Sequence, residues 1–195
     1  LQLALTWQRM PWTAAALGSG EEAEQKPSGS GKLVTNEARL VEAMCLVSSR
    51  IIHGDPLTER KSTFQAHLAS VTSADQAKAV VAVLIQNRKI AAATHNMVAY
   101  RVHLGNGVWA QDCDDDGETA AGSRMLHLLQ TVDAEDVVVV VSRWYGGIKL
   151  GPDRFKLINN CARQLLDLHG YVKSSNDKGE RSKSTVPKSS RKQRK

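Results

Sequence analysis

Five consecutive valines at residues 137–141 constrain the fold of this chain more than any other feature. A run of this length is too short to cross a bilayer, which requires about 20 apolar residues. β-Branched side chains crowd a helix but suit a pleated strand, and a strand that is apolar at every position is normally covered on both faces. The run therefore predicts a buried β-strand.

A glycine-rich loop follows the valines. Gly146, Gly147 and Gly151 break the chain, and Pro152 is suited to the first position of a helix. Loops of this kind present backbone N–H groups and often bind an anion or a partner, although this one lacks both the Walker and the G-x-G-x-x-G patterns. Whether the glycines serve a ligand or only the backbone geometry stays open. The candidate site residues of this basic loop are Arg143, Trp144, Tyr145, Lys149 and Arg154.

An acidic run, Asp-Cys-Asp-Asp-Asp-Gly-Glu at residues 112–118, is the second candidate site. We expect it between a hairpin strand and a helix, where the helix dipole favours negative charge. Three interpretations are open: helix capping with ion pairing to the basic loop, a partner-binding surface, and a magnesium or acid–base site. The spacing does not match an EF-hand calcium loop. The candidate residues are Asp114, Asp115, Asp116 and Glu118.

The cysteines and histidines of the chain do not form a recognisable catalytic or metal-binding pattern. We therefore predict no catalytic site, no metal site and no cofactor. Cys113 lies among carboxylates that raise its pKa, and Cys161 is expected to be a core thiol. An odd number of widely spaced cysteines is typical of a reducing compartment, so we expect a cytoplasmic protein. Four histidines lack a metal-like spacing and are interpreted as surface residues: His67, His95, His103 and His127.

Apolar periodicity and turn signals predict the secondary structure. The expected order after a leading helix is strand, helix, hairpin, helix, strand and helix, which indicates an α+β domain. We expect a four-stranded sheet with its helices on one face. The predicted elements are helices at residues 36–49, 73–88, 119–132 and 152–168, strands at 62–70 and 137–141, and a hairpin of 97–104 with 108–111.

The chain ends differ in composition from its centre. Residues 1–35 are rich in Gly, Ser, Pro and Glu and predict a flexible linker, and residues 36–53 a helix and turn leading into a domain at 54–172. Residues 173–195 hold nine basic and two acidic side chains, whereas residues 1–172 hold 17 and 18. The net charge of +6 therefore belongs to a basic disordered tail. The tail lacks aromatic residues, so we expect only a weak electrostatic contact with RNA.

Several long motifs, in order, resemble those of the Impact family. They are Lys-Ser-Thr-Phe-Gln-Ala-His at 61–67, Ala-Thr-His-Asn at 93–96, residues 111–122 across the acidic run, Val-Val-Ser-Arg-Trp-Tyr-Gly-Gly at 140–147, and Leu-Gly-Pro-Asp-Arg-Phe at 150–155. The resemblance covers roughly residues 54–171 and is closest to the eukaryotic Impact protein, with the bacterial YigZ-type proteins as more distant relatives.

The resemblance implies a fold and a function. The fold would be similar to the second domain of ribosomal protein S five, an α+β two-layer sandwich. Impact-like proteins regulate translation in amino-acid starvation by competing with the general-control kinase of initiation factor two's alpha subunit for its ribosome-associated activator. The ribosome and actin are further partners that the resemblance implies. It implies no enzymatic activity, so the candidate residues of the loop and the acidic run become candidate partner-binding residues.

One feature departs from the family. Impact proteins normally carry an RWD module ahead of this domain, and such a module needs on the order of 100 residues. Only residues 1–53 precede the resemblance, so we expect the module to be absent or to have been cut off. Two alternative functions stay open from the residues alone: an RNA- or ribosome-binding domain, and a metal-dependent enzyme that uses the acidic run.

Overall fold

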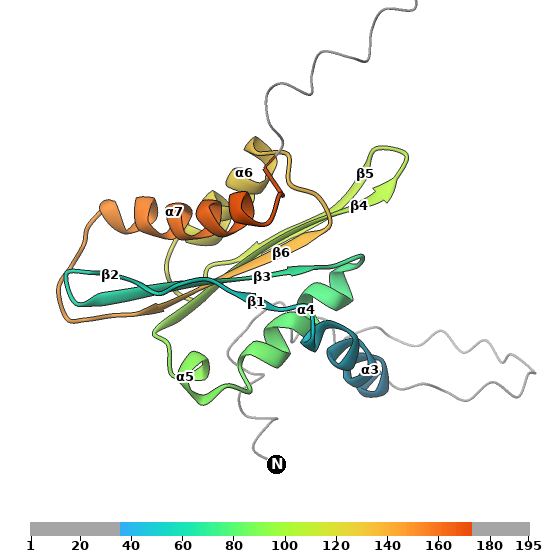
Figure 1. Ribbon diagram of the computed structural model, residues 1–195, viewed down its shortest axis with the longest axis horizontal. Helices are drawn as coiled ribbons and strands as arrows, with labels where there is room; N and C mark the ends of the chain where they lie inside the picture. Colours follow the sequence, from blue (N-terminus) through green and yellow to red (C-terminus); the bar gives the residue numbers. More distant parts are fainter. Residues whose placement is uncertain (1–35, 173–195) are drawn as a thin grey trace, which may run out of the picture.

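The structure is a computed structural model that describes residues 36–172 (Figure 1). The linker predicted at 1–35 and the tail predicted at 173–195 lie outside the described residues. The elements, in chain order, are α3 (Asn36–Ser48), β1 (Ile52–His53), β2 (Leu57–Glu59), β3 (Ser62–Ser70), α4 (Ala74–Leu84), α5 (Arg88–Ala91), β4 (His95–Gly105), β5 (Val108–Asp114), α6 (Ala121–Thr131), β6 (Val137–Trp144) and α7 (Asp153–Leu168).

An antiparallel sheet lies at the centre of the fold, with the strand order β1-β3-β6-β4-β5. The valine strand β6 lies in the middle, hydrogen-bonded to β3 on one side and to β4 on the other. The short strands β1 and β2 pair with different parts of β3, so together they form one edge of the sheet. β5 forms the other edge.

Helices cover both faces of this sheet (Figure 1). Val139 and Val141 belong to the core beneath α6 and α7, whereas Val138 and Val140 belong to the core beneath α4, on which α3 packs. The α+β class predicted from the sequence is confirmed. The sheet has six strands rather than four, and its helices occupy two faces rather than one. The valines explain this arrangement, because successive strand side chains point to opposite faces and all five are apolar.

The predicted helices are present with small changes at their ends. Ser73 caps α4, its Oγ accepting from the Gln76 amide at 3.2 Å, while Gln76 Oε1 accepts from the amide of Thr72 rather than of Ser73. The single helix predicted over residues 73–88 is divided, because α4 ends at Leu84 and the short helix α5 begins after the cap residue Asn87. Within the described residues, no helix has the length and hydropathy needed to span a membrane.

The hairpin of β4 and β5 is longer than predicted. β5 continues to Asp114, so the first part of the acidic run is strand and only its later part is loop. α6 then begins after Ala120, which adopts a left-handed conformation at φ 66°. The turn between β5 and α6 is therefore short, and it holds the run's last carboxylates close to the end of β6.

Candidate functional site

The candidate site lies where the end of β6, the turn before α6 and the first turn of α7 meet. Glu118 contributes its carboxylate from the turn, and it is bonded by two arginines. Its Oε1 accepts from Nε of Arg154 at 2.6 Å, and its Oε2 accepts from Nη1 of Arg143. The exposed fractions of the Glu118, Arg143 and Arg154 side chains are 7%, 6% and 26%. The ion-pair cluster is thus nearly closed to solvent.

Strand periodicity places Arg143 in this cluster. It follows Val141 by two residues on β6 and therefore points to the same face, toward α6 and α7. Its guanidinium lies 5.5 Å from the ring of Phe64, which pairs with it in the β3–β6 register. Arg154 approaches from the first turn of α7 and also donates to the Gly151 carbonyl at 2.7 Å.

The other carboxylates of the acidic run bond to the backbone. Asp115 accepts from the amides of Ala120 and Gly122, both at 2.7 Å, and so caps the start of α6. Asp116 accepts from the amide of Asn96 at 2.8 Å, and Asp114 accepts from the amide of Asp116 at 2.8 Å. The structure therefore shows the capping and ion pairing that formed one of the three interpretations of this run.

His95 also belongs to this site, although the sequence indicated only a surface residue. Its Nδ1 lies 2.8 Å from the carbonyl oxygen of Asp116, and its Nε2 lies 3.8 Å from Oε2 of Glu118. The Ala-Thr-His-Asn motif was a signal for it, because His95 and Asn96 together hold the acidic turn against the start of β4.

The basic loop after β6 divides into parts with different environments. Trp144 points to the opposite face from Arg143, and its indole donates to the Lys89 carbonyl of α5 at 3.0 Å. Tyr145 is 43% exposed, and Lys149 is exposed. The structure thus brings Arg143 and Arg154 together with Glu118, and the Tyr145 ring lies beside the cluster, its centre 5.4 Å from the Arg143 guanidinium. Trp144 and Lys149 do not join the cluster.

Close packing anchors this loop at Gly146. A Cβ at this position would lie 1.9 Å from the Lys61 carbonyl oxygen, so only glycine fits against the β2–β3 turn. The Gly146 amide donates to Ser62 Oγ at 3.2 Å, and the Tyr145 amide donates to Thr94 Oγ1 at 3.0 Å. The glycine therefore serves packing between two segments.

A buried polar network crosses the other face of the sheet. Ser142 donates to Asn96 Oδ1 at 2.6 Å and lies 3.3 Å from His67 Nε2, whose Nδ1 is 2.8 Å from Nδ1 of His53. The interpretation of His67 as a surface residue was wrong, because it is 1% exposed. Burial first, and then His53, lower the pKa of His67 from 6.5 to about 4. Ser142 and His67 resemble two of the three members of a catalytic triad, but Ser142 is closed to solvent.

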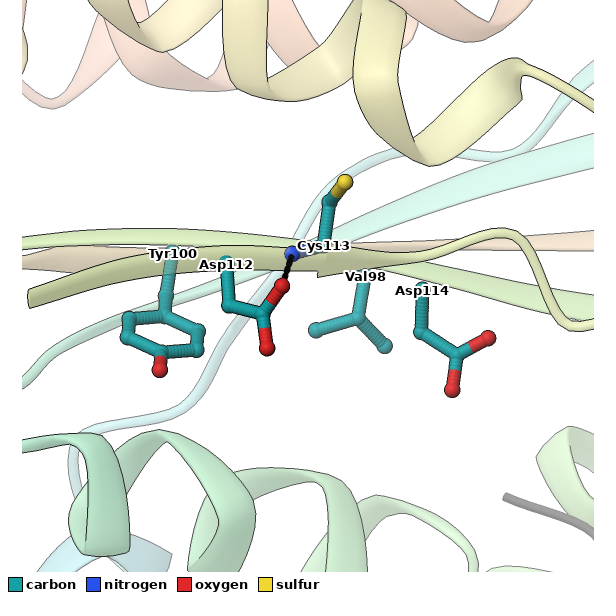
Figure 2. Close-up of a pocket in the computed structure, with 5 residues that line it drawn as sticks. All are labelled: Val98, Tyr100, Asp112, Cys113 and Asp114. Atoms are coloured by element: carbon teal, nitrogen blue, oxygen red, sulfur yellow. Dashed lines mark hydrogen bonds between the residues drawn. The ribbon is translucent and has the colours of Figure 1, made fainter. Parts of the chain in front are cut away.

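A shallow surface depression, with no room for an enclosed water molecule, lies on the α4 side of the β4–β5 hairpin. Figure 2 shows Val98, Tyr100, Asp112 and Asp114 pointing to one side of the strands and Cys113 to the other. Burial first, and then neighbouring carboxylates, raise the pKa values of Tyr100 and Cys113. Within residues 36–172, no three His, Cys, Asp or Glu side chains are grouped to hold a metal ion.

A comparison with models of protein families shows which family the chain belongs to. The Impact N-terminal domain matches residues 60–166, more than half of the sequence. The chain belongs to the Impact family. The match extends from the β2–β3 turn into α7 and so includes Glu118, Arg143 and Arg154.

Curated relatives in this family are similar over the same part of the chain. Protein IMPACT-A of Xenopus tropicalis is 60% identical over 128 residues, which are 65% of this chain and 40% of the relative. Protein IMPACT of Homo sapiens is 58% identical over 125 residues, which are 64% of this chain and 39% of the relative. The chain therefore spans less than half the length of these relatives.

Two solved structures are also similar. One, of the two-domain translational regulator Yih1, is 42% identical and covers 78% of this chain and 56% of its own, with a TM-score of 0.47. The other, a crystal structure of a hypothetical protein, is 30% identical and covers 60% of each chain, with a TM-score of 0.52. The second likeness supports the fold described above.

Proposed function

We propose that this chain is a non-enzymatic regulator of translation. In this proposal it acts in the amino-acid starvation response by competing for the ribosome-associated activator of the initiation-factor-two alpha kinase. Membership of the Impact family and the motifs at residues 61–67, 111–122 and 140–155 support the proposal. The chain spans less than half the length of its curated relatives. We therefore assign the activity of a whole Impact protein to this chain only as a proposal.

One observation carries the proposal. The carboxylates that could bind a metal ion or catalyse a reaction are bonded to arginines or to backbone amides, while the loop beside them is exposed. Glu118 is bonded by Arg143 and Arg154, and Asp115 by two backbone amides. A metal-dependent enzyme would need such carboxylates available to an ion. This pairing favours a structural role for the acidic run and leaves the exposed loop as the contact surface.

The exposed part of that loop is suited to binding a protein. Tyr145 and Ile148 are each 43% exposed, and Lys149 lies next to them in the sequence. The contacts of Gly146 with Lys61 and Ser62 hold the loop in one conformation. A preorganised surface loses less conformational entropy on binding than a flexible one. We therefore place the contact with the activator at Tyr145, Ile148 and Lys149, beside Arg154.

A capture experiment tests this proposal. The immobilised full chain is incubated with the purified activator and, separately, with ribosomes, at about 50 and 200 mM salt. We expect capture of the activator, reduced at least about tenfold by Ile148→Ser with Lys149→Ser. Lys156→Ser on α7 is the matched control, because Lys156 is also exposed, and it should leave capture unchanged. Failure of the unmodified chain to capture either partner at the lower salt concentration contradicts the proposal.

A further inference from the structure

Three segments that are distant in the sequence meet at one end of the sheet: the β2–β3 turn, α5 and the loop after β6. In Figure 1 the β2–β3 turn and the loop after β6 lie at the left, and α5 lies lower and to their right. The Gly146 amide donates to Ser62 Oγ at 3.2 Å, which joins the loop to the turn. The Trp144 indole donates to the Lys89 carbonyl at 3.0 Å, which joins the loop to α5.

Exposed positive charge is concentrated at this end, which we name the basic corner. Glu59 lies 3.8 Å from Arg60, but both side chains are more than half exposed, so the pair is weak and the corner stays positive. Residues 1–172 as a whole are close to neutral, with 17 basic and 18 acidic side chains, so this concentration is local. The exposed basic residues of the corner are Arg60, Lys61, Arg88, Lys89 and Lys149.

Two aromatic rings lie at this end of the sheet, one beside the exposed Lys89 and one beside the buried Arg143. Lys89 Nζ is 5.5 Å from the centre of the Trp144 ring, and the guanidinium of Arg143 is 5.4 Å from the centre of the Tyr145 ring. Tyr145 is 43% exposed. Proteins that bind single-stranded nucleic acid combine basic side chains that contact the phosphates with aromatic rings on which bases stack. The corner presents both kinds of group together.

The backbone of the β2–β3 turn indicates that its side chains matter. Glu59 and Ser62 are paired, so the turn consists of two residues, Arg60 at φ 43° and Lys61 at φ 63°. Positive φ at both positions strongly favours Asn-Gly in such turns, and other residues are strained there. Arg60 and Lys61 occupy these strained positions, although the backbone conformation favours neither arginine nor lysine. We infer that their positive charges have a function that offsets the strain.

We propose that the basic corner binds single-stranded RNA. The exposed cations would contact successive phosphates, and the exposed ring of Tyr145 would stack on a base. A duplex keeps its bases stacked inside, so an exposed ring favours the single strand. The basic residues come from three separate segments and are therefore spread over the surface. This arrangement is suited to the RNA backbone, which carries one negative charge per nucleotide. This inference goes beyond the proposed function, because it requires no contact with the activator.

The test uses the full chain and a fluorescein-labelled oligouridylate of 12 nucleotides, with anisotropy measured over a series of salt concentrations. The double variant Arg60→Asn with Lys61→Gly removes two charges and introduces the residues that the turn prefers, so the fold should be kept. We expect it to bind the oligonucleotide about tenfold more weakly, with the slope of log K against log salt reduced by about 1.4. We expect Tyr145→Ala to weaken binding at least about fivefold, because it removes base stacking.

The controls separate the corner from the basic residues 173–195, which every variant retains. Lys156→Gln with Arg163→Gln removes the same charge from exposed positions of α7 and should leave the affinity within about twofold. Melting temperatures show that each variant is folded. Equal affinities for the corner variant, the α7 control and the unmodified chain would overturn the inference and assign RNA attachment to the tail. Loss of activator capture by Arg60→Asn with Lys61→Gly, with RNA binding unchanged, would also overturn it, since the corner would then be a protein contact.

Discussion

Glu118 and Arg143 form an ion pair in which both partners are more than nine-tenths buried, with exposed fractions of 7% and 6%. Arg154 bonds the other oxygen of the same carboxylate. The pair joins the turn before α6 to the end of β6, and Arg154 joins both to the start of α7. One carboxylate thus holds three segments of the domain in place, while the exposed loop extends beside it.

Glu118→Gln should strongly destabilise the domain. The substitution leaves the guanidinium of Arg143 buried without a full counter-charge, and breaking a buried ion pair on one side costs about 4 kcal/mol. Urea unfolding measures the change in the free energy of unfolding. Glu59→Gln is the matched control, because Glu59 is paired with Arg60 at an exposed position and should change stability by less than about 1 kcal/mol. Similar losses of unfolding free energy in the two variants would show that the buried ion pair stabilises the domain no more than the exposed one.

Gly146→Ala should be far more damaging than Gly147→Ala. A Cβ at Gly146 would collide with the Lys61 carbonyl, whereas a Cβ at Gly147 would have no neighbour within 4 Å among residues 36–172 apart from the adjacent residues of the chain. Gly147 has φ 86°, so alanine there should cost only about 1 kcal/mol of backbone strain. We expect at least about 3 kcal/mol for Gly146→Ala, because neither backbone segment can move freely. Thermal unfolding compares the two variants, and equal melting temperatures would contradict the close packing.

Stability should fall as the pH is lowered from about 6.5 to about 4. Burial and His53 lower the pKa of His67 to about 4, so the unfolded chain binds this proton before the folded chain does. The stabilisation is therefore complete above 6.5 and is lost as the pH falls through the window, by about 3 kcal/mol in total. His67→Asn should reduce this slope of unfolding free energy against pH, while His103→Asn, at an exposed strand position, should keep it. An unchanged slope in His67→Asn would exclude His67 as its source.

The three cysteines should react with a thiol reagent in a fixed order. Cys45 is exposed, Cys113 is partly buried and Cys161 is buried. Burial raises the pKa of Cys161 to about 11, and burial with nearby carboxylates raises that of Cys113. Since the thiolate is the reactive form, the folded chain should label rapidly once, at Cys45, and Cys45→Ser should remove this phase. Rapid labelling of Cys161 in the folded chain would contradict its burial.

Local patterns accounted for most of the secondary structure. Ser62–Ser70 was predicted as a strand with the same bounds, because its apolar residues alternate. The split of the second helix at Leu84 was missed, since α5 depends on Asn87 capping a single turn that packs against Trp144. β1 and β2 were also missed. They are short, and they are defined by pairing with β3 rather than by a pattern of their own.

The sequence by itself determined the α+β class, the burial of the valine strand and the roles of Cys113 and Cys161, because each depends on side chains close together along the chain. Only the tertiary structure decided which carboxylate of the acidic run forms ion pairs with Arg143 and Arg154. Glu118 is 25 residues from Arg143 and 36 from Arg154, and Ser142 is 75 residues from His67. Ion pairs and buried hydrogen bonds depend on distances of a few ångströms, and only the packing of the helices on both faces of the sheet sets those distances.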